Sequence, residues 1–261
     1  MKMSIHCTVL TPAYNTSKYI QEAIYSVFQQ KYTDWDIVVV NDGSTDNTER
    51  VVHELVPNRR ISVVSLKKNV GVTEATAIGI EHCIGPVITI LDSDDKLLPN
   101  SLQDVVPHFQ DPELGFAWSL FQTSRGGRGW SGPLPAGKTL YEALVSNWWR
   151  ASHQRFFRKS TYMQSAKLRG DIKASSDFQL ALLVASTGCK TLHIPKITYW
   201  YRIGRPGCLS RNSRYQKRCV RQSISYVREN DENTCHHSSI QKTRLPCKDT
   251  QISSERSIIK M

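Results

Sequence analysis

Acidic residues gather directly after apolar segments in the first half of this 261-residue chain. Asp92, Asp94 and Asp95 lie within four residues of one another after one apolar run, and Asp42 follows another. A single aspartate in such a place is usually a turn residue or a helix cap. Three neighbouring carboxylates repel one another unless a cation joins them. The residues therefore predict a site for a divalent cation.

The elements that must position these residues alternate in type. Apolar runs typical of buried strands occupy residues 7–10, 36–40, 61–66 and 87–91, and helical spacing of apolar residues occurs in 19–30, 44–55 and 73–82. This alternation predicts an α/β fold with a mostly parallel central sheet and helices on both faces. Because ligands bind beyond the carboxyl ends of parallel strands, the acidic residues should collect at the ligand-binding rim.

The pattern loosens after residue 110. Weaker signals predict strands at 116–122, 192–194 and 197–203, and helices at 140–149, 177–187 and 215–227. We interpret residues 1–110 and 111–228 as two halves of one domain. From Glu229 the periodicity disappears, which predicts that residues 229–261 are a disordered basic tail.

One segment matches a phosphate-binding loop. GPLPAGKT, residues 132–139, has the required glycine, lysine and threonine spacing. The preceding residues, RGGRGWS, are those of a loop and not of a strand, and Pro133 and Pro135 lack the backbone N–H groups that cradle phosphate. We therefore predict a loop that leads into a helix, and not a nucleotide triphosphatase.

The net charge of +11 is unevenly distributed. Residues 1–110 carry a net charge of −4 and the remainder +15. Solubility, an anionic acceptor, an anionic membrane surface and nucleic acid all remain open explanations of the basic half. No apolar run approaches the roughly 20 residues that span a bilayer, and the start is unlike a signal peptide. We expect a cytoplasmic protein, with peripheral membrane association as an open possibility.

Several blocks together identify a family resemblance. VLTPAYNTSKYIQEAIYSVFQQKYTDWDIVVVNDGSTDNT resembles the amino-terminal signature of the inverting family 2 glycosyltransferases, and NVGVTEATAIGI and ILDSDDKLLPNSL resemble the next two blocks. SSDFQLALLVASTG and YWYRIGRPGCLSR are weaker matches further along the chain. The resemblance implies the GT-A (nucleotide-diphospho-sugar transferase) fold, with residues 1–110 as the nucleotide-sugar-binding half and 111–228 as the acceptor-side half.

The implied reaction moves a hexose-type sugar, with inversion, from a UDP-sugar donor to a hydroxyl of a glycan or lipid-linked acceptor in polysaccharide biosynthesis. A Mn²⁺ or Mg²⁺ ion held by Asp94 with help from Asp92 would neutralise the leaving diphosphate. Asp95 would bond to ribose or hold the other two carboxylates in place, and Asp42 would hydrogen-bond the nucleobase. The remaining residues implied for the donor pocket are Pro12, Ala13, Tyr14 and Ser93.

On the acceptor side the resemblance implies that Asp177 is the general base that takes the proton of the attacking hydroxyl. Read without the family, an aspartate in a first helical turn is usually a favourable helix-dipole charge. Aromatic faces suit sugar rings, although such residues are more often part of a core. The residues implied for the acceptor side are Trp148, Trp149, His153 and Arg202.

The sequence departs from the family pattern at three places. Thr76 and Ala77 stand where arginine and asparagine are common, so an expected phosphate-side cation is missing and diphosphate binding depends more on the metal. Gly204 occupies the position of a frequent histidine, and Ser176 that of a frequent acidic residue before the base.

Two other classes of function compete with the transferase. A nucleotidyltransferase of similar fold would also bind a nucleotide beside an acidic pair. A non-enzymatic, basic nucleic-acid-binding protein is disfavoured because the sequence has no such motif and the predicted rim is acidic, so nucleic acid is not an expected partner.

Overall fold

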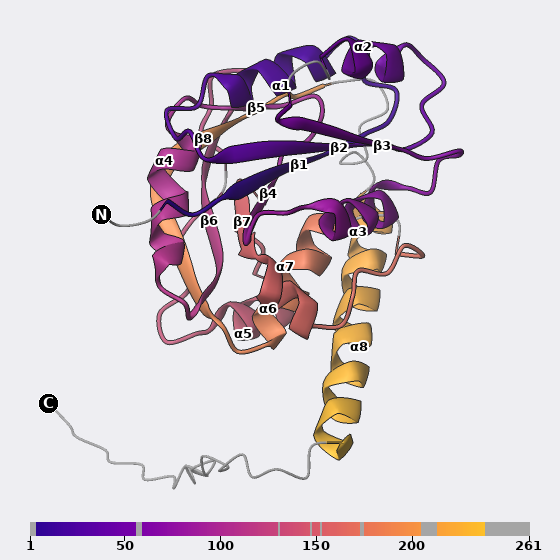
Figure 1. The fold of residues 1–261 in the computed structure, drawn as a ribbon. Helices are drawn as coiled ribbons and strands as arrows, with labels where there is room; N and C mark the ends of the chain where they lie inside the picture. Colours follow the sequence, from indigo (N-terminus) through magenta and orange to yellow (C-terminus); the bar gives the residue numbers. More distant parts are fainter. Residues whose placement is uncertain are drawn as a thin grey trace, which may run out of the picture.

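The computed structural model describes residues 4–55, 59–129, 131–146, 148–151, 153–172, 175–204 and 213–237 (Figure 1). Its strands are β1 (Cys7–Ala13), β2 (Trp35–Asn41), β3 (Ile61–Ser65), β4 (Val87–Ile90), β5 (Lys96–Leu97), β6 (Leu114–Thr123), β7 (Arg155–Arg158) and β8 (Lys190–Tyr201). Its helices are α1 (Ile20–Phe28), α2 (Thr48–Leu55), α3 (Val72–His82), α4 (Ser101–Val105), the 3-10 helix η1 (Val106–Gln110), α5 (Leu140–Val145), α6 (Lys159–Gln164), α7 (Ser176–Ser186) and α8 (Ser213–His237).

The described strands form one sheet in the order β3-β2-β1-β4-β7-β6-β8-β5. β1 pairs in parallel with β2 and β4, and β2 pairs in parallel with β3, as the alternating pattern predicts. Ala13 lies opposite Asn41 at the ends of β1 and β2, and Leu10 lies opposite Ile90 near the end of β4. The carboxyl ends of these strands therefore meet at one rim.

Helices cover both faces of this sheet because its strands are apolar on both sides. Val39 packs in a buried cluster with residues of α1 and α2, whereas its neighbours Val38 and Val40 pack in a second cluster with residues of α3 and α7. Figure 1 shows α1 and α2 on one side of β1–β3 and α3 and α7 on the other. Adjacent strand residues point to opposite faces, so the unbroken apolar run in β2 supplies both clusters.

The second half of the chain continues the same sheet. β7 pairs antiparallel with β4 and β6, and β5 from the first half pairs antiparallel with β8. Strands of the two predicted halves therefore pair with one another within one sheet.

The sequence pattern does not predict β5, β7, α4, η1 and α6, because elements of two to six residues are too short for a periodic pattern to stand out.

Several segments differ in their bounds from the expectation. The helix predicted for 140–149 ends at Val145. The strands predicted for 192–194 and 197–203 are one strand, β8, whose register against β6 shifts between Ile194 and Ile197. The last helix extends to His237, across the boundary predicted between residues 228 and 229, and the rest of the predicted tail lies outside the described residues.

The segment that matches a phosphate-binding loop is a loop that leads into α5, as predicted. Thr139 is the N-cap of this helix, and its hydroxyl accepts a hydrogen bond from the Glu142 backbone N–H. The Glu142 carboxylate in turn accepts the Thr139 backbone N–H at 2.8 Å, which completes a capping box. The threonine that matched the motif therefore starts a helix.

No helix in the described ranges is long and apolar enough to cross a membrane.

Candidate active site

The ends of β1 and β2 form one side of the rim. Pro12 and Ala13 are buried, whereas the next residue, Tyr14, is 42% exposed. Asp42 follows β2 and is 2% exposed; its carboxylate accepts the backbone N–H groups of Val70 at 2.7 Å and Gly71 at 3.0 Å. Burial raises the pKa of Asp42, against the lowering effect of these two hydrogen bonds. Asp42 thus stabilises the loop before α3 by accepting two backbone hydrogen bonds, and it lies at the rim where the nucleotide is predicted to bind.

The acidic turn after β4 has one carboxylate buried at its base. Asp95 is 1% exposed and accepts hydrogen bonds from the Tyr199 hydroxyl and the Arg202 backbone N–H, both at 2.8 Å. Burial, with the carboxylates of Asp92 and Asp94, raises the pKa of Asp95 well above its ordinary value. This environment favours a nearby cation, because a positive charge would offset both the desolvation and the mutual repulsion.

His153 lies beside this turn. Its Nε2 is 3.7 Å from Oδ2 of Asp92, and ligand atoms of Asp92, Asp95 and His153 all lie within 4.8 Å of one another. Two carboxylates and one imidazole are a donor set that divalent cations such as Mn²⁺ accept. The residues present therefore fit such an ion. The group does not include Asp94, and it includes a histidine that the sequence analysis expected on the acceptor side.

Asp177 lies in the first turn of α7, where a negative charge interacts favourably with the helix dipole. Its Oδ1 accepts the backbone N–H of Phe178 at 2.9 Å, and its side chain is 28% exposed. Its Oδ2 lies 3.6 Å from Nη1 of Arg155, a residue that is 4% exposed at the start of β7. Asp177 is therefore oriented by the fold and still open to a ligand.

One short segment connects the two acidic sites. His153 contacts Asp92, and two residues later Arg155 contacts Asp177. The reason is the direction of β7: an antiparallel neighbour of β4 begins where β4 ends, so the residues at its start lie at the rim. The fold thereby brings Asp92 and Asp177, which are distant in sequence, into contact with two residues that are only two positions apart in the chain.

Aromatic residues line the region around these groups. The His153 ring packs against Phe121, Tyr199 and Tyr201, with ring centroids 5.0 to 5.2 Å apart. Trp149 is partly buried and packs edge-on against Phe178, the neighbour of Asp177, at 5.2 Å.

Trp148 is also partly buried and packs against the core residue Trp118 at 6.4 Å. Of the two predicted tryptophans, Trp149 is the one that contacts the helix carrying Asp177.

Arg202 is held in a structural position. Its Nε donates to the backbone carbonyl of Asp94 at 2.7 Å, and its Nη2 donates to the Glu22 carboxylate at 2.5 Å. Its guanidinium lies between the rings of Tyr19 and Trp200, 4.8 and 4.7 Å from their centroids. The side chain predicted for the acceptor side therefore ties the acidic turn to α1.

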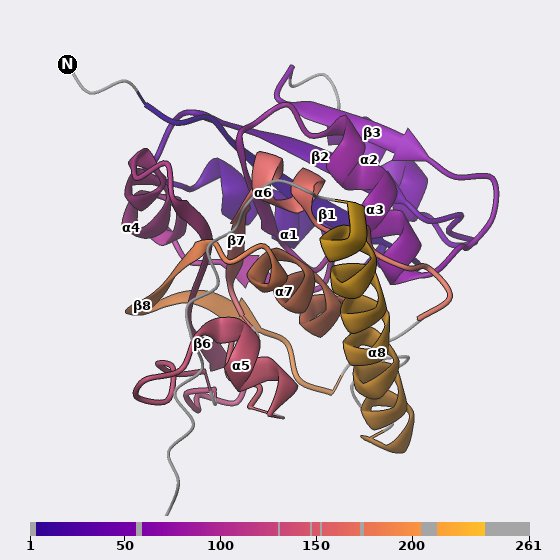
Figure 2. The same cartoon turned by 90° about the horizontal axis from the view of Figure 1, so that it is seen from below.

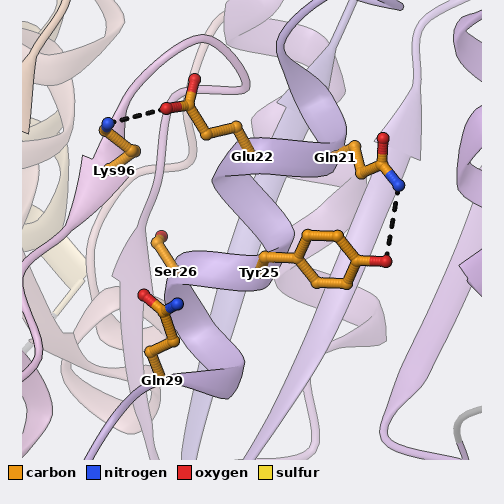
Figure 3. A pocket seen from close by; sticks show the side chains of 6 residues that line it. All are labelled: Gln21, Glu22, Tyr25, Ser26, Gln29 and Lys96. Carbon is orange, nitrogen blue, oxygen red and sulfur yellow. Dashed lines mark hydrogen bonds and ion pairs between the residues drawn. The ribbon is translucent and has the colours of Figure 1, made fainter.

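A surface pocket of about 440 Å³ lies on the outer side of α1 (Figure 3). Gln21, Glu22, Tyr25, Ser26 and Gln29 line it together with Lys96, whose Nζ is 2.7 Å from the Glu22 carboxylate. It contains none of the residues predicted for the site, so the candidate site is the open rim and not this pocket.

Two residues that complete the rim were missed by the sequence analysis. Tyr199 bonds to Asp95, and Arg155 contacts Asp177. For Arg155 the sequence did offer a signal, because this arginine directly precedes the apolar pair Phe156 and Phe157. A charged residue beside such core residues is rarely buried without a partner, so a partner of opposite charge could have been expected.

Comparison with known proteins identifies the family of this chain. The profile of glycosyl transferase family 2 matches residues 8–170. The chain therefore belongs to family 2 of the glycosyltransferases.

Among curated proteins, the chain is 29% identical over 201 residues to a chondroitin synthase of Escherichia coli, which covers 74% of this chain and 28% of that protein. It is also 29% identical over 202 residues to a hyaluronan synthase of Pasteurella multocida, which covers 74% of this chain and 20% of that protein. The chain thus spans about a quarter of the length of these relatives or less.

Solved structures show the same fold. TarS 1-349 of S. aureus in complex with UDP superposes with a TM-score of 0.64 at 20% identity, covering 77% of this chain and 61% of that one. Mannosyltransferase PcManGT from Pyrobaculum calidifontis, in complex with GDP-Man and Mn²⁺, superposes with a TM-score of 0.63 at 16% identity, covering 92% and 77%. The fold is GT-A, as the motifs predict.

Proposed function

We propose that this chain transfers a hexose-type sugar, with inversion, from a UDP-sugar donor to a hydroxyl of a glycan or lipid-linked acceptor. The observation that carries the proposal is the position of Arg155 and His153, which link Asp177 to the acidic turn at a single rim. The polysaccharide synthases among the relatives and the UDP-GlcNAc complex of TarS support the choice of donor and product class.

On the donor side, the exposed ring of Tyr14 would stack on the nucleobase, with Pro12 and Ala13 beneath it and Asp42 bonding to the base. Asp92, Asp94 and Ser93 would face the ribose and diphosphate. A Mn²⁺ or Mg²⁺ ion held here would neutralise the charge that develops on the diphosphate as it leaves. The Mn²⁺ in the PcManGT complex supports this part of the proposal.

On the acceptor side, Asp177 would take the proton of the attacking hydroxyl. The hydroxyl oxygen forms a bond to the anomeric carbon as the bond from that carbon to the diphosphate oxygen breaks. Attack from the face opposite the leaving group inverts the configuration at this carbon. The buried guanidinium of Arg155 would hold Oδ2 of Asp177, and Trp149 would offer an aromatic face to a sugar ring.

A panel of sugar nucleotides tests the proposal directly. Each donor is incubated with the protein, Mn²⁺ and candidate glycan acceptors, and the products are identified by mass spectrometry and by the anomeric coupling in proton NMR. We expect one UDP-sugar to yield UDP and an inverted glycoside. Release of sugar 1-phosphate, with the nucleoside monophosphate attached to the product, would instead assign the chain to the nucleotidyltransferases.

A further inference from the structure

The outward face of α8 carries a row of positive charge. Its members are all exposed and fall on an arc of about 100° at 3.6 residues per turn; they are Arg214, Lys217, Arg218, Arg221 and Arg228. The opposite face is buried: Cys219 and Val227 are each 1% exposed, and Ser223 is fully buried. Figure 2 shows α8 running beside α7 along the outside of the domain. We refer to the five side chains as the α8 basic face.

Within the part of the chain that the structure describes, these cations are not paired with carboxylates. In the described ranges, no ion pair joins any of the five cations to a carboxylate, whereas the exposed cations Arg50, Lys190 and Lys196 are each paired with one. Like charges spaced three or four residues apart on a helix repel one another. A binding partner that supplies negative charge along the helix would relieve this repulsion.

The charge belongs to the folded domain. Residues 111–228 contain 20 lysines and arginines against 5 aspartates and glutamates, whereas residues 229–261 contain 5 of each kind. The positive excess of the second half therefore lies in the domain, and α8 presents a quarter of these basic side chains on one exposed line.

We propose that the α8 basic face binds the surface of a membrane rich in anionic lipid headgroups. A straight row of separate long side chains fits many headgroups spread over a plane, whereas a single small anion would need donors that converge on one point. Tyr215, 40% exposed at the edge of the row, is of a type that favours the boundary between headgroups and water.

The binding is electrostatic and not insertional, because the apolar side of α8 is already buried in the protein. It should therefore weaken strongly with salt. The inference stands apart from the proposed transfer reaction, since no residue of the α8 basic face belongs to the candidate active site. If the protein fails to bind membranes, the tests of the sugar donor and of Asp177 as general base keep their meaning.

Vesicle sedimentation of the full chain tests the proposal. Binding to phosphatidylglycerol–phosphatidylcholine vesicles is compared with binding to pure phosphatidylcholine vesicles, at low and high salt. We expect binding only to the anionic vesicles at low salt. Replacing Arg214, Arg218 and Arg221 by glutamine should weaken it about 100-fold, since each cation near an anionic surface contributes about fivefold.

A matched triple variant controls for net charge. Arg125→Gln, Arg128→Gln and Lys138→Gln remove the same charge from exposed positions between β6 and α5, and should leave binding within a few-fold of the unchanged protein. Circular dichroism and thermal unfolding establish that both variants fold. Equal losses in the two variants, or binding to neutral vesicles, would overturn the proposal. So would binding to soluble polyphosphate or duplex DNA without binding to anionic vesicles, which would make the face a polyanion site.

Discussion

Nη1 of Arg155 lies 3.6 Å from Oδ2 of Asp177, so a buried arginine at the start of β7 holds the residue proposed as the general base. The other carboxylate oxygen, Oδ1, accepts the backbone N–H of Phe178. Both oxygens therefore have a fixed donor or cation, while 28% of the side chain stays exposed. The contacts of both oxygens hold the Asp177 side chain in one orientation at the start of α7.

Asp177→Asn should abolish most transfer without loss of folding. Asparagine keeps the shape of the side chain but cannot accept the proton, so the rate should fall roughly 10²–10⁴-fold. Donor affinity, measured by calorimetry, should hardly change, because the proposed nucleotide contacts are on Asp42, Asp92 and Asp94. Asp171→Asn is the matched control: Asp171 is exposed and paired with Arg169, and its loss should leave transfer nearly normal. Near-normal transfer by a folded Asp177→Asn protein would place the base elsewhere.

Arg155→Met should lower kcat while KM for the donor stays nearly unchanged. Without the guanidinium, Oδ2 of Asp177 loses the cation that lies 3.6 Å from it, so the carboxylate is held less firmly in one direction. We expect kcat to fall roughly 10–100-fold because misplacing a reacting group is costly, and Arg155→Lys should restore part of it. Arg158→Met, on the same strand but bonded to backbone carbonyls, should lower stability without lowering kcat. An unchanged kcat in a folded Arg155→Met protein would refute the positioning role.

UDP should stabilise the protein against heat only when Mn²⁺ or Mg²⁺ is present. The carboxylates of Asp92, Asp94 and Asp95 otherwise repel the diphosphate, and Thr76 and Ala77 supply no cation in its place. Thermal unfolding with UDP in excess Mn²⁺ and in EDTA measures the difference, since a ligand raises Tm according to its saturation. Equal stabilisation under both conditions would exclude a metal role for the acidic turn.

His153→Gln should weaken Mn²⁺ binding and remove a nitrogen ligand. The imidazole lies within 4.8 Å of the ligand atoms of Asp92 and Asp95, which is close enough for one ion to join all three. Pulsed electron paramagnetic resonance of bound Mn²⁺ should detect coupling to a ¹⁴N nucleus, lost in His153→Gln and retained in His82→Gln, an exposed control. Absence of nitrogen coupling in the unchanged protein would show that His153 does not bind Mn²⁺ and that its contacts are those with the surrounding aromatic rings.

The order and type of the main elements in the first hundred residues could be predicted from local sequence patterns. The apolar runs of β1, β2 and β4 are buried on both faces, so their composition already specifies parallel strands, and their carboxyl ends necessarily share one rim. The short segments that follow these strands, such as 41–43 and 92–95, consist of residues typical of turns and can be recognised without knowledge of the rest of the fold. The family, the fold and the acidic turn could be predicted for this reason.

The residues that the second half of the chain contributes to the rim depend on strand pairing across the whole sheet. β7 has four residues and no distinctive pattern, yet its antiparallel pairing with β4 carries His153 to Asp92 and Arg155 to Asp177. The same holds for β8, which brings Tyr199 to Asp95 and ties Arg202 to the backbone of the acidic turn and to α1. Strand pairing joins residues far apart in the chain, and its direction depends on the packing of the whole sheet, so no local pattern encodes it.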